Sequence, residues 1–237
     1  MKMRAISQTN KKNNFIPPLE NGDSLTRPEF ERRYNAMPHL KKAELIEGIV
    51  YMASPLRFEP HAEPHANLMI WLGTYKIATP GLRLGDNPTV RLDLDNEPQP
   101  DIVLLIDRQY GGQSHLSEDG YIEGAPELVA EISASTATID LRDKKRAYRR
   151  NGVKEYIVWQ VGDRQLDWFK LEGGDYLSLM PENGIIRSQI FPGLWLDLAA
   201  LLAGEMPQVL TTLQAGLASA EHQAFRTQLT TVQNRES

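Results

Sequence analysis

Cysteine is absent from this chain of 237 residues. Disulfides, thiolate metal sites and cysteine nucleophiles are therefore excluded. The sequence also has no apolar run long enough to cross a bilayer, and residues 1–18 lack the apolar core of a signal peptide. These absences predict a cytoplasmic protein that makes no contact with a membrane.

A surplus of positive charge is missing as well. The formal net charge is −5, whereas domains that coat nucleic acid by bulk charge usually carry a basic surplus. Basic residues are nevertheless concentrated in one run, made of Arg142, Lys144, Lys145, Arg146, Arg149 and Arg150. This run is either a local contact for a polyanion or a solvated helix face, and the sequence leaves both interpretations open.

The first half of the chain predicts a flexible tail followed by alternating helices and strands. Residues 1–26 are polar and are interrupted by two prolines, which is typical of a tail. Hydrophobic periodicity predicts the elements that follow. They are a helix from Thr26, a hairpin over 41–55 with its turn at Glu47-Gly48, a helix over 64–79, and strands over 89–95, 101–106 and 127–133.

The second half predicts a helix that ends at Asn151-Gly152, followed by a meander of strands over 155–161, 164–172, 176–180 and 185–191. A helix is expected directly after Pro192-Gly193, and residues 205–233 have a helical pattern that we expect to be loosely attached. We therefore predict a tail (1–26), one α/β domain (27–204) and a C-terminal helical extension (205–237).

Two carboxylates lie in strands that are otherwise apolar, Asp101 in PQPDIVLLI and Glu131 in PELVAEIS. Burying an ionised carboxylate in a core strand costs free energy on the order of several kcal/mol, unless a partner compensates the charge. If the two strands are neighbours, both carboxylates can bind one hard cation such as Mg²⁺. Lys144 shares a helix face with Leu141 and Tyr148, so it is expected to point toward the same place.

The order of these motifs resembles that of the Uma2 proteins. PQPD, PELVAEIS, and then D-x-x-x-K-x-x-x-Y-x-x-x-G-V-x-E-Y follow one another within residues 27–200, together with the upstream AELIEGIVYMASP. Uma2 proteins are grouped with the PD-(D/E)XK, restriction-endonuclease-like superfamily. The resemblance implies an α/β (α+β) fold in which helices flank a mixed central β-sheet, with an N-terminal hairpin and a C-terminal helix.

The resemblance also implies roles for individual residues. Asp101 corresponds to the PD aspartate and Glu131 to the acid of the second half-motif, and the backbone carbonyl of Ile132 would be a further metal ligand. The lysine two positions after Glu131 is replaced by Ser133, and its function would pass to Lys144. Glu44 would be an additional acid. The implied activity is Mg²⁺-dependent cleavage of DNA, with Mn²⁺ as a possible substitute and a homodimer as a possible assembly.

Each of these residues also has an interpretation in which it serves the structure alone. Asp101 follows a proline and could cap a turn, Glu131 could pair with an arginine, and Lys144 could lie along the surface. A nuclease fold without activity, serving as a nucleic-acid or protein binding module, is the alternative function. His61 and His65 are four residues apart, but Pro64 suggests that the helix begins only there, which disfavours a two-histidine metal site.

Overall fold

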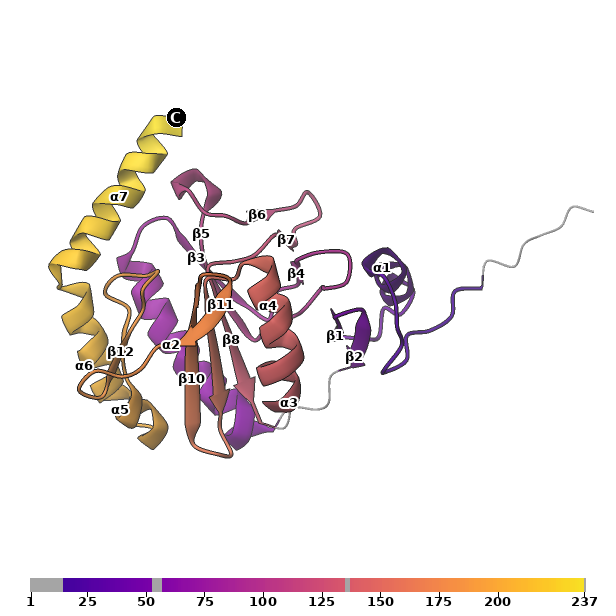
Figure 1. The fold of residues 1–237 in the computed structure, drawn as a ribbon, viewed down its shortest axis with the longest axis horizontal. Coiled ribbons are helices and arrows are strands. Elements are labelled where there is room, and N and C mark those ends of the chain that lie inside the picture. The colour runs from indigo at the N-terminus through magenta and orange to yellow at the C-terminus, as the bar shows by residue number, and fades with distance from the viewer. Residues whose placement is uncertain (1–14, 53–56, 135–136, 237) are drawn as a thin grey trace, which may run out of the picture.

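The computed structural model describes residues 15–52, 57–134 and 137–236. A six-stranded sheet forms its centre, with strand order β11-β10-β9-β8-β5-β3 (Figure 1). β8 and β9 are parallel and all other neighbours are antiparallel, so the sheet is mixed as expected. The strands are β3 (Leu82–Asp86), β5 (Ile102–Ile106), β8 (Leu128–Ser133), β9 (Glu155–Gln160), β10 (Gln165–Glu172) and β11 (Asp175–Ser178).

Helices cover both faces of this sheet (Figure 1). On one face lie α2 (Glu63–Ala78), α5 (Leu198–Ala203) and α6 (Met206–Leu217), with α7 (Ala220–Glu236) outside them. On the other face a continuous helical segment runs through α3 (Ala137–Ile139), the π-helical turn η3 (Asp140–Lys144) and α4 (Lys145–Asn151). None of the helices within the described residues is long and apolar enough to cross a membrane.

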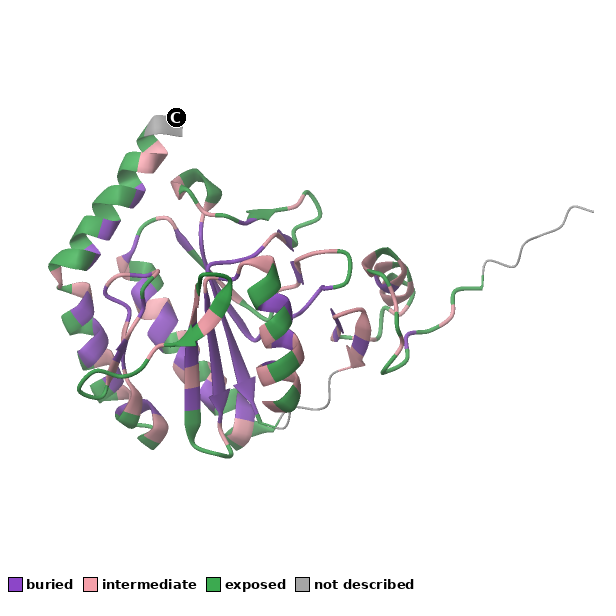
Figure 2. Ribbon diagram, in the orientation of Figure 1, coloured by how far each residue is buried: buried purple, intermediate pink, exposed green. Residues whose placement is uncertain are grey.

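Alternation along the central strands assigns side chains to the two faces. Ile102 and Leu104 belong to the cluster under α2, whereas Val103 and Leu105 belong to the cluster under α4. Successive side chains of a strand point to opposite faces, so odd-numbered residues of β5 face α4. The central strands are buried along most of their length (Figure 2).

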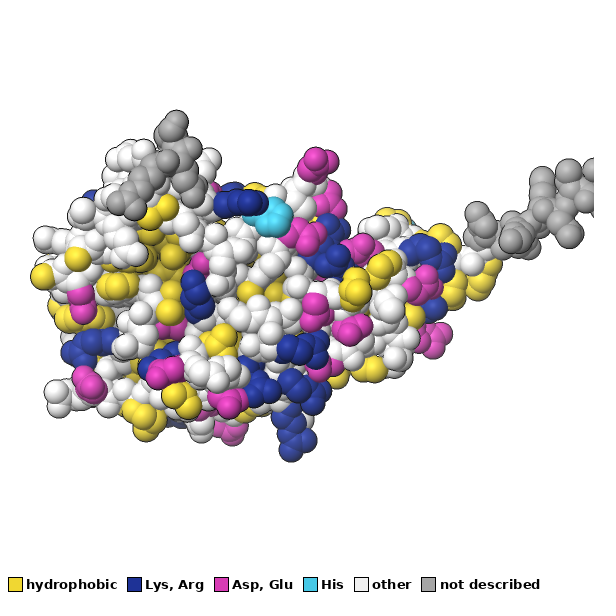
Figure 3. Space-filling model, turned by 45° about the horizontal axis from the view of Figure 1, so that its top comes forward, with side chains coloured by type: hydrophobic (Ala, Val, Ile, Leu, Met, Phe, Trp, Pro, Cys, Tyr) yellow, Lys and Arg dark blue, Asp and Glu magenta, His cyan; other side chains and the backbone are white. Residues whose placement is uncertain are grey.

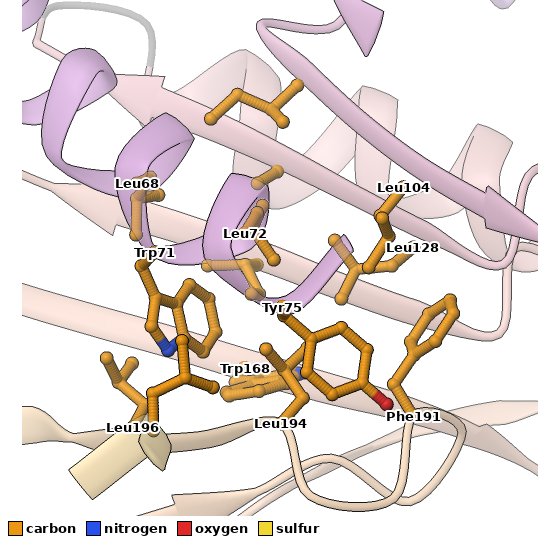
Figure 4. Close-up of a cluster of buried hydrophobic side chains, with 14 of the residues drawn as sticks. Leu68, Trp71, Leu72, Tyr75, Leu104, Leu128, Trp168, Phe191, Leu194 and Leu196 are labelled. Carbon is orange, nitrogen blue, oxygen red and sulfur yellow. The ribbon is translucent and has the colours of Figure 1, made fainter. Parts of the chain in front are cut away.

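The larger core lies between the sheet and α2. Trp71, Leu72 and Tyr75 of α2 point toward Trp168 and Phe191 (Figure 4). The indole rings of Trp71 and Trp168 meet edge to face, with centroids 5.7 Å apart. Edge-to-face contact matches the positive edge of one ring to the negative face of the other. The tryptophans of this face therefore serve packing, as their periodic positions predicted.

An N-terminal unit with its own small core adjoins the face that carries α4. It contains α1 (Arg27–Asn35) and the hairpin of β1 (Ala43–Ile46) and β2 (Ile49–Met52). Leu19 is buried in this core, and Gly22 and Leu25 donate backbone hydrogen bonds to Val50 and Gly48. Residues 19–25 are thus paired with the hairpin, which corrects the prediction of a flexible tail as far as residue 26. Residues 1–14 of that tail lie outside the described residues.

The segment around the predicted strand 89–95 differs from the prediction. The strand expected over 89–95 is reduced to β4 (Val90–Arg91), because the backbone turns back where Leu92 donates to the Asn96 carbonyl. β4 joins a small sheet with β6 (His115–Leu116) and β7 (Ile122–Glu123). The 3₁₀ turn η2 (Arg108–Tyr110) precedes β6, so the connection between β5 and β8 contains regular elements of its own.

The C-terminal part corrects two further expectations. β12 (Ile185–Arg187) does not extend the central sheet but pairs with β13 (Trp195–Asp197), a strand in the place where a helix was expected. The helix begins only at Leu198, where the Asp197 side chain accepts the Ala200 N–H as an N-cap. The helix expected to be loosely attached is also wrong, because Val209 and Leu213 of α6 are fully buried in the main core.

A half-buried arginine links the N-terminal unit to β4 and β7. Arg91 lies 3.0 Å from Glu31 of α1, 3.3 Å from Glu123 of β7 and 3.8 Å from Glu97. Burial, the hydrogen bond with Glu31 and the charge of Glu31 raise the pKa of Glu97 to about 8. In this cluster a proton on Glu97 relieves the repulsion between two carboxylates that share one guanidinium.

This raised pKa makes stability depend on pH. Between pH ~4.5 and ~8 the folded state retains a proton on Glu97 that the unfolded chain has released. The free energy of unfolding should therefore fall as the pH rises through this window, and Glu97→Gln, which mimics the protonated form, should flatten the slope. Urea unfolding from pH 5 to 8 measures this dependence on pH, and Glu118→Gln at an exposed position is the matched control. Equal slopes in wild type and Glu97→Gln would contradict the assignment.

The place of α6 in the main core can be tested by truncating one side chain. Leu213→Ala should lower the free energy of unfolding by about 2–5 kcal/mol, because it removes a fully buried side chain and leaves a cavity. Gln214→Ala, next to it on the exposed side, should change the value by less than about 0.5 kcal/mol. Chemical unfolding distinguishes them, and a small effect of Leu213→Ala would mean that α6 folds independently of the sheet.

Candidate active site

Asp101 and Glu131 face each other across two neighbouring strands. Asp101 immediately precedes β5, and Glu131 is the fourth residue of β8. Ile102 is paired with Ala130 in the antiparallel ladder, so the next positions along it are 101 and 131. Directly opposite residues project from the same face of a sheet. Both side chains are buried, and both belong to the face that carries α4. The strands therefore bring the two predicted acids together.

Lys144 completes this site from the helical segment above it. Its Nζ donates to Glu131 Oε1 at 3.0 Å and lies 2.9 Å from Glu44 Oε1 and 3.8 Å from Asp140 Oδ1. Glu44 arrives from β1 of the N-terminal unit and also accepts the Gln99 N–H at 2.8 Å. All four predicted site side chains thus converge, and Lys144 is buried rather than exposed on the helix surface.

The hydrogen bonds of Glu131 are confined to one of its oxygens. Oε1 accepts from Lys144 Nζ and from the Tyr148 hydroxyl at 2.9 Å. Within the described part of the chain, Oε2 accepts none. Lys144 and Tyr148 are four residues apart and reach the same atom, as their shared helix face predicted. Glu131 pairs with a lysine, so the expected alternative of an arginine partner does not hold.

The hydrogen bonds of Asp101 likewise go to one of its two carboxylate oxygens. Its Oδ2 accepts the Ile132 N–H at 2.8 Å and lies 3.2 Å from Nε2 of His61. Its Oδ1 faces the Lys42 ammonium at 3.5 Å. Asp101 therefore does more than cap a turn, because its side chain joins β8, the N-terminal unit and the segment that leads into α2.

Burial and charge set the protonation states of this site. Burial opposes ionisation of Asp101, but the His61 ring, Lys42 and the Ile132 N–H together lower its pKa to about 2. Burial raises the pKa of Glu131 to about 8, although Lys144 opposes this rise and Asp101, Asp140 and Glu44 reinforce it. Burial alone would lower the pKa of Lys144, but the surrounding carboxylates raise it well above its usual value. Lys144 is therefore a permanent cation and hydrogen-bond donor here, not a base.

The donor set suits a hard divalent cation. In the described part of the chain, Lys42 and Lys144 supply two positive charges to the carboxyl groups of Glu44, Asp101, Glu131 and Asp140, and the His61 ring lies beside Asp101. Over residues 15–52, 57–134 and 137–236, no three His, Asp or Glu side chains surround one point in a way that could hold a metal ion. Two carboxylates would therefore need a backbone donor and waters, which is the arrangement that Mg²⁺ commonly accepts.

The backbone of Ile132 is oriented for such a role. The N–H and C=O of one strand residue point to the same side, as when a hydrogen-bonded pair exchanges both bonds. Since the Ile132 N–H points to Asp101, its carbonyl lies on that side too. β5 begins only at Ile102, so the paired part of β5 does not extend to this position.

Two residues at the site escaped the sequence prediction. Lys42 stands two positions before Glu44, and that spacing in a strand already placed it on the same side. His61 was set aside because Pro64 indicated a late helix start. The helical path in fact begins with the π-helical turn η1 (Phe58–Ala62), which runs directly into α2. His61 and His65 then stack 6.1 Å apart, and His65 Nε2 reaches the Asp101 carbonyl at 3.2 Å.

The basic run is largely paired within the molecule. Arg146 and Arg150 each lie 3.0 Å from Glu47 of the hairpin turn, and Arg149 pairs with Asp175. Lys145 stands over the Phe169 ring, 3.4 Å from its centroid. Several of these charges therefore connect α4 to the N-terminal unit and to β10–β11, while Arg142, Arg146, Arg149 and Arg150 remain exposed as expected for a solvated face. A contact with a polyanion stays a prediction.

Replacing Lys144 should show how much its contacts with the surrounding carboxylates contribute to the free energy of unfolding. Lys144→Met should lower the free energy of unfolding by about 3–5 kcal/mol at pH 9, where Glu131 is ionised, because this buried carboxylate and the half-buried Glu44 would lose their cation. Adding Glu131→Gln should recover part of this loss, whereas the exposed Arg142→Met should cost little. Denaturant titration of the four proteins measures the effect, and no loss with Lys144→Met would show that the ion pairs are solvated.

Comparison with known proteins agrees with this geometry. Residues 27–199 match the model of the Uma2 family, described as "Putative restriction endonuclease". No curated protein matches. Among solved structures, the chain is similar to a "putative nuclease belonging to DUF820" from Anabaena variabilis ATCC 29413, with a TM-score of 0.53 and 12% identity over 77% of this chain and 97% of that one. This likeness shows a shared fold. Because the family model covers most of its length and contains the whole site, the chain belongs to the Uma2 family.

Proposed function

We propose that this protein is a Mg²⁺-dependent endonuclease that hydrolyses phosphodiester bonds in DNA, with Mn²⁺ as a substitute ion. The observation that supports this most is the convergence of Asp101, Glu131 and Lys144 in one buried site, with the two acids opposite each other on neighbouring strands. The nuclease description of the family and the shared fold point the same way.

In this proposal Asp101, Glu131 and the Ile132 carbonyl hold the divalent ion. When bound, Mg²⁺ lowers the pKa of a coordinated water and neutralises charge on a phosphate. Lys144 supplies a fixed positive charge beside Glu131, which stabilises the additional negative charge of a phosphoryl transition state. Its raised pKa excludes a role as proton acceptor near neutral pH.

Two further side chains fix the acids. Tyr148 holds Oε1 of Glu131 and His61 holds Oδ2 of Asp101, so neither carboxylate rotates freely. Groups that orient ligands in this way commonly matter about 10–100-fold for metal affinity or activity. Glu44 acts indirectly, because it shares the Lys144 ammonium with Glu131. Cutting both strands of a duplex would be served by a homodimer, which stays a prediction from the family resemblance.

Cleavage assays test the proposal. Wild-type protein should cut single- or double-stranded DNA with Mg²⁺ and not with EDTA, and Asp101→Asn, Glu131→Gln and Lys144→Met should each reduce the rate by about 100-fold or more. Exposed Asp163→Asn and Glu118→Gln are matched controls that should keep full activity. Thermal unfolding must show that each inactive variant is folded. Cleavage that survives Asp101→Asn, or that needs no divalent ion, would contradict these roles.

A second candidate is a nuclease-fold protein that binds nucleic acid or protein without cleaving. It is favoured by Ser133, which stands where the superfamily places a lysine and donates instead to Asp140 at 2.9 Å. Calorimetry with Mg²⁺ and Mn²⁺ separates the two candidates. Binding that Glu131→Gln weakens supports the nuclease, whereas the absence of any such binding favours the second candidate.

A further inference from the structure

A cavity with basic side chains in its lining lies at the opposite end of β5 from Asp101. It has a volume of about 450 Å³, and its lining includes Arg83 of β3, Arg108 of η2 and His115 of β6. Asp107 at this end lies six positions after Asp101, which corresponds to roughly 20 Å along an extended strand. None of the active-site side chains lines this cavity. It is therefore a separate place on the molecule.

In the described part of the chain, the basic side chains of the cavity make few ion pairs. Arg108 is exposed, and no acid within the described residues lies at ion-pair distance from its guanidinium. Arg83 has only a long contact, 3.6 Å to Asp107 Oδ2. Asp107 is the one carboxylate in the lining, and its Oδ1 accepts the Gln109 N–H at 3.1 Å. Two arginines and an exposed histidine thus outweigh a single acid, in a chain whose overall charge is −5.

Ser114 contributes to the lining but not to the charge. This residue is only 1% exposed, and its hydroxyl is enclosed and finds no hydrogen-bond partner in the part of the chain that the structure describes. The groups that a ligand in the cavity can reach are therefore the exposed basic side chains, which favour an acceptor-rich anion.

We propose that this cavity binds a phosphate group carried by a small molecule of nucleotide size. Guanidinium groups match phosphate oxygens with two parallel hydrogen bonds, and Arg83 and Arg108 reach the cavity from different elements. Leu105 and Leu116 also line it, and Leu116 is exposed, so an apolar side stands beside the basic one. The volume lies within the range of small-molecule sites. The end of the molecule that carries β6 comes forward in Figure 3, where a histidine side chain lies against basic ones.

This site does not depend on the nuclease proposal. The site would recognise its ligand through the phosphate dianion, which can belong to inorganic phosphate or to a nucleoside monophosphate. The apolar side distinguishes these sources, because only the nucleotide has a planar ring to place there. Thymidine 5′-monophosphate binding more tightly than inorganic phosphate assigns the site to nucleotides, and equal affinities assign it to phosphate itself.

Calorimetry on the full chain tests the proposal, with inorganic phosphate and thymidine 5′-monophosphate as probes. EDTA is present throughout, so that a metal at the active site cannot contribute. Wild type should bind at least one probe with one-to-one stoichiometry. Arg83→Ala and Arg108→Ala should each weaken binding about tenfold, since each removes a charged hydrogen-bonding group. Arg226→Ala, which removes an exposed arginine of α7, should leave it unchanged.

Asp101→Asn separates this inference from the proposed function. It should bind both probes as wild type does, whether or not the protein cleaves DNA. The proposal is overturned if neither probe binds up to millimolar concentration, or if binding persists in the Arg83→Ala/Arg108→Ala double variant. It is equally overturned if Asp101→Asn abolishes binding while Arg108→Ala does not. Unfolding midpoints close to wild type confirm that each variant is folded, which is expected because both arginines are exposed.

Discussion

The ammonium group of Lys144 joins three parts of the chain that are remote in sequence. Its contacts reach Glu44 in the N-terminal hairpin, Glu131 in the central sheet and Asp140 one turn earlier in its own helical segment. Each of these carboxylates would be costly at its depth without a cation. The position of the hairpin, the docking of the helical segment and the ionisation of Glu131 therefore depend on one another through a single charge.

Because these contacts join parts of the chain that are remote in sequence, the sequence predicted only some of the site residues. Glu131 has apolar neighbours on both sides, so its burial and its need for a partner followed from the strand pattern. Lys144 followed from helical spacing with Tyr148. Glu44 had no such signal, because the hairpin and the sheet approach each other only in three dimensions, and its place came from the family resemblance.

Of the two site residues that were missed, His61 lies in a π-helical turn, η1, which is continuous with α2. Such turns are common at functional sites, but they break the 3.6-residue pattern from which helices are inferred. For that reason the helix start was placed at Pro64, although the chain was already helical at Phe58. The strand predicted over 185–191 exists as the shorter β12, but its partner β13 escaped because a strand of three residues gives too few positions to show alternation.

The hydrogen bonds around the two central acids select which oxygen atoms remain for a ligand. Lys144 and Tyr148 both use Oε1 of Glu131, and the Ile132 N–H and His61 both use Oδ2 of Asp101. In the described part of the chain, Oε2 of Glu131 and Oδ1 of Asp101 accept no hydrogen bond, and Oδ1 has only the Lys42 ammonium at 3.5 Å. Lys144 need not leave Glu131 for a cation to bind the other oxygen. Carboxylates fixed through one oxygen have lost their rotational freedom in advance, so a cation that binds the second oxygen does not pay that entropy. The same bonds that stabilise the fold thus prepare the acids for metal chemistry.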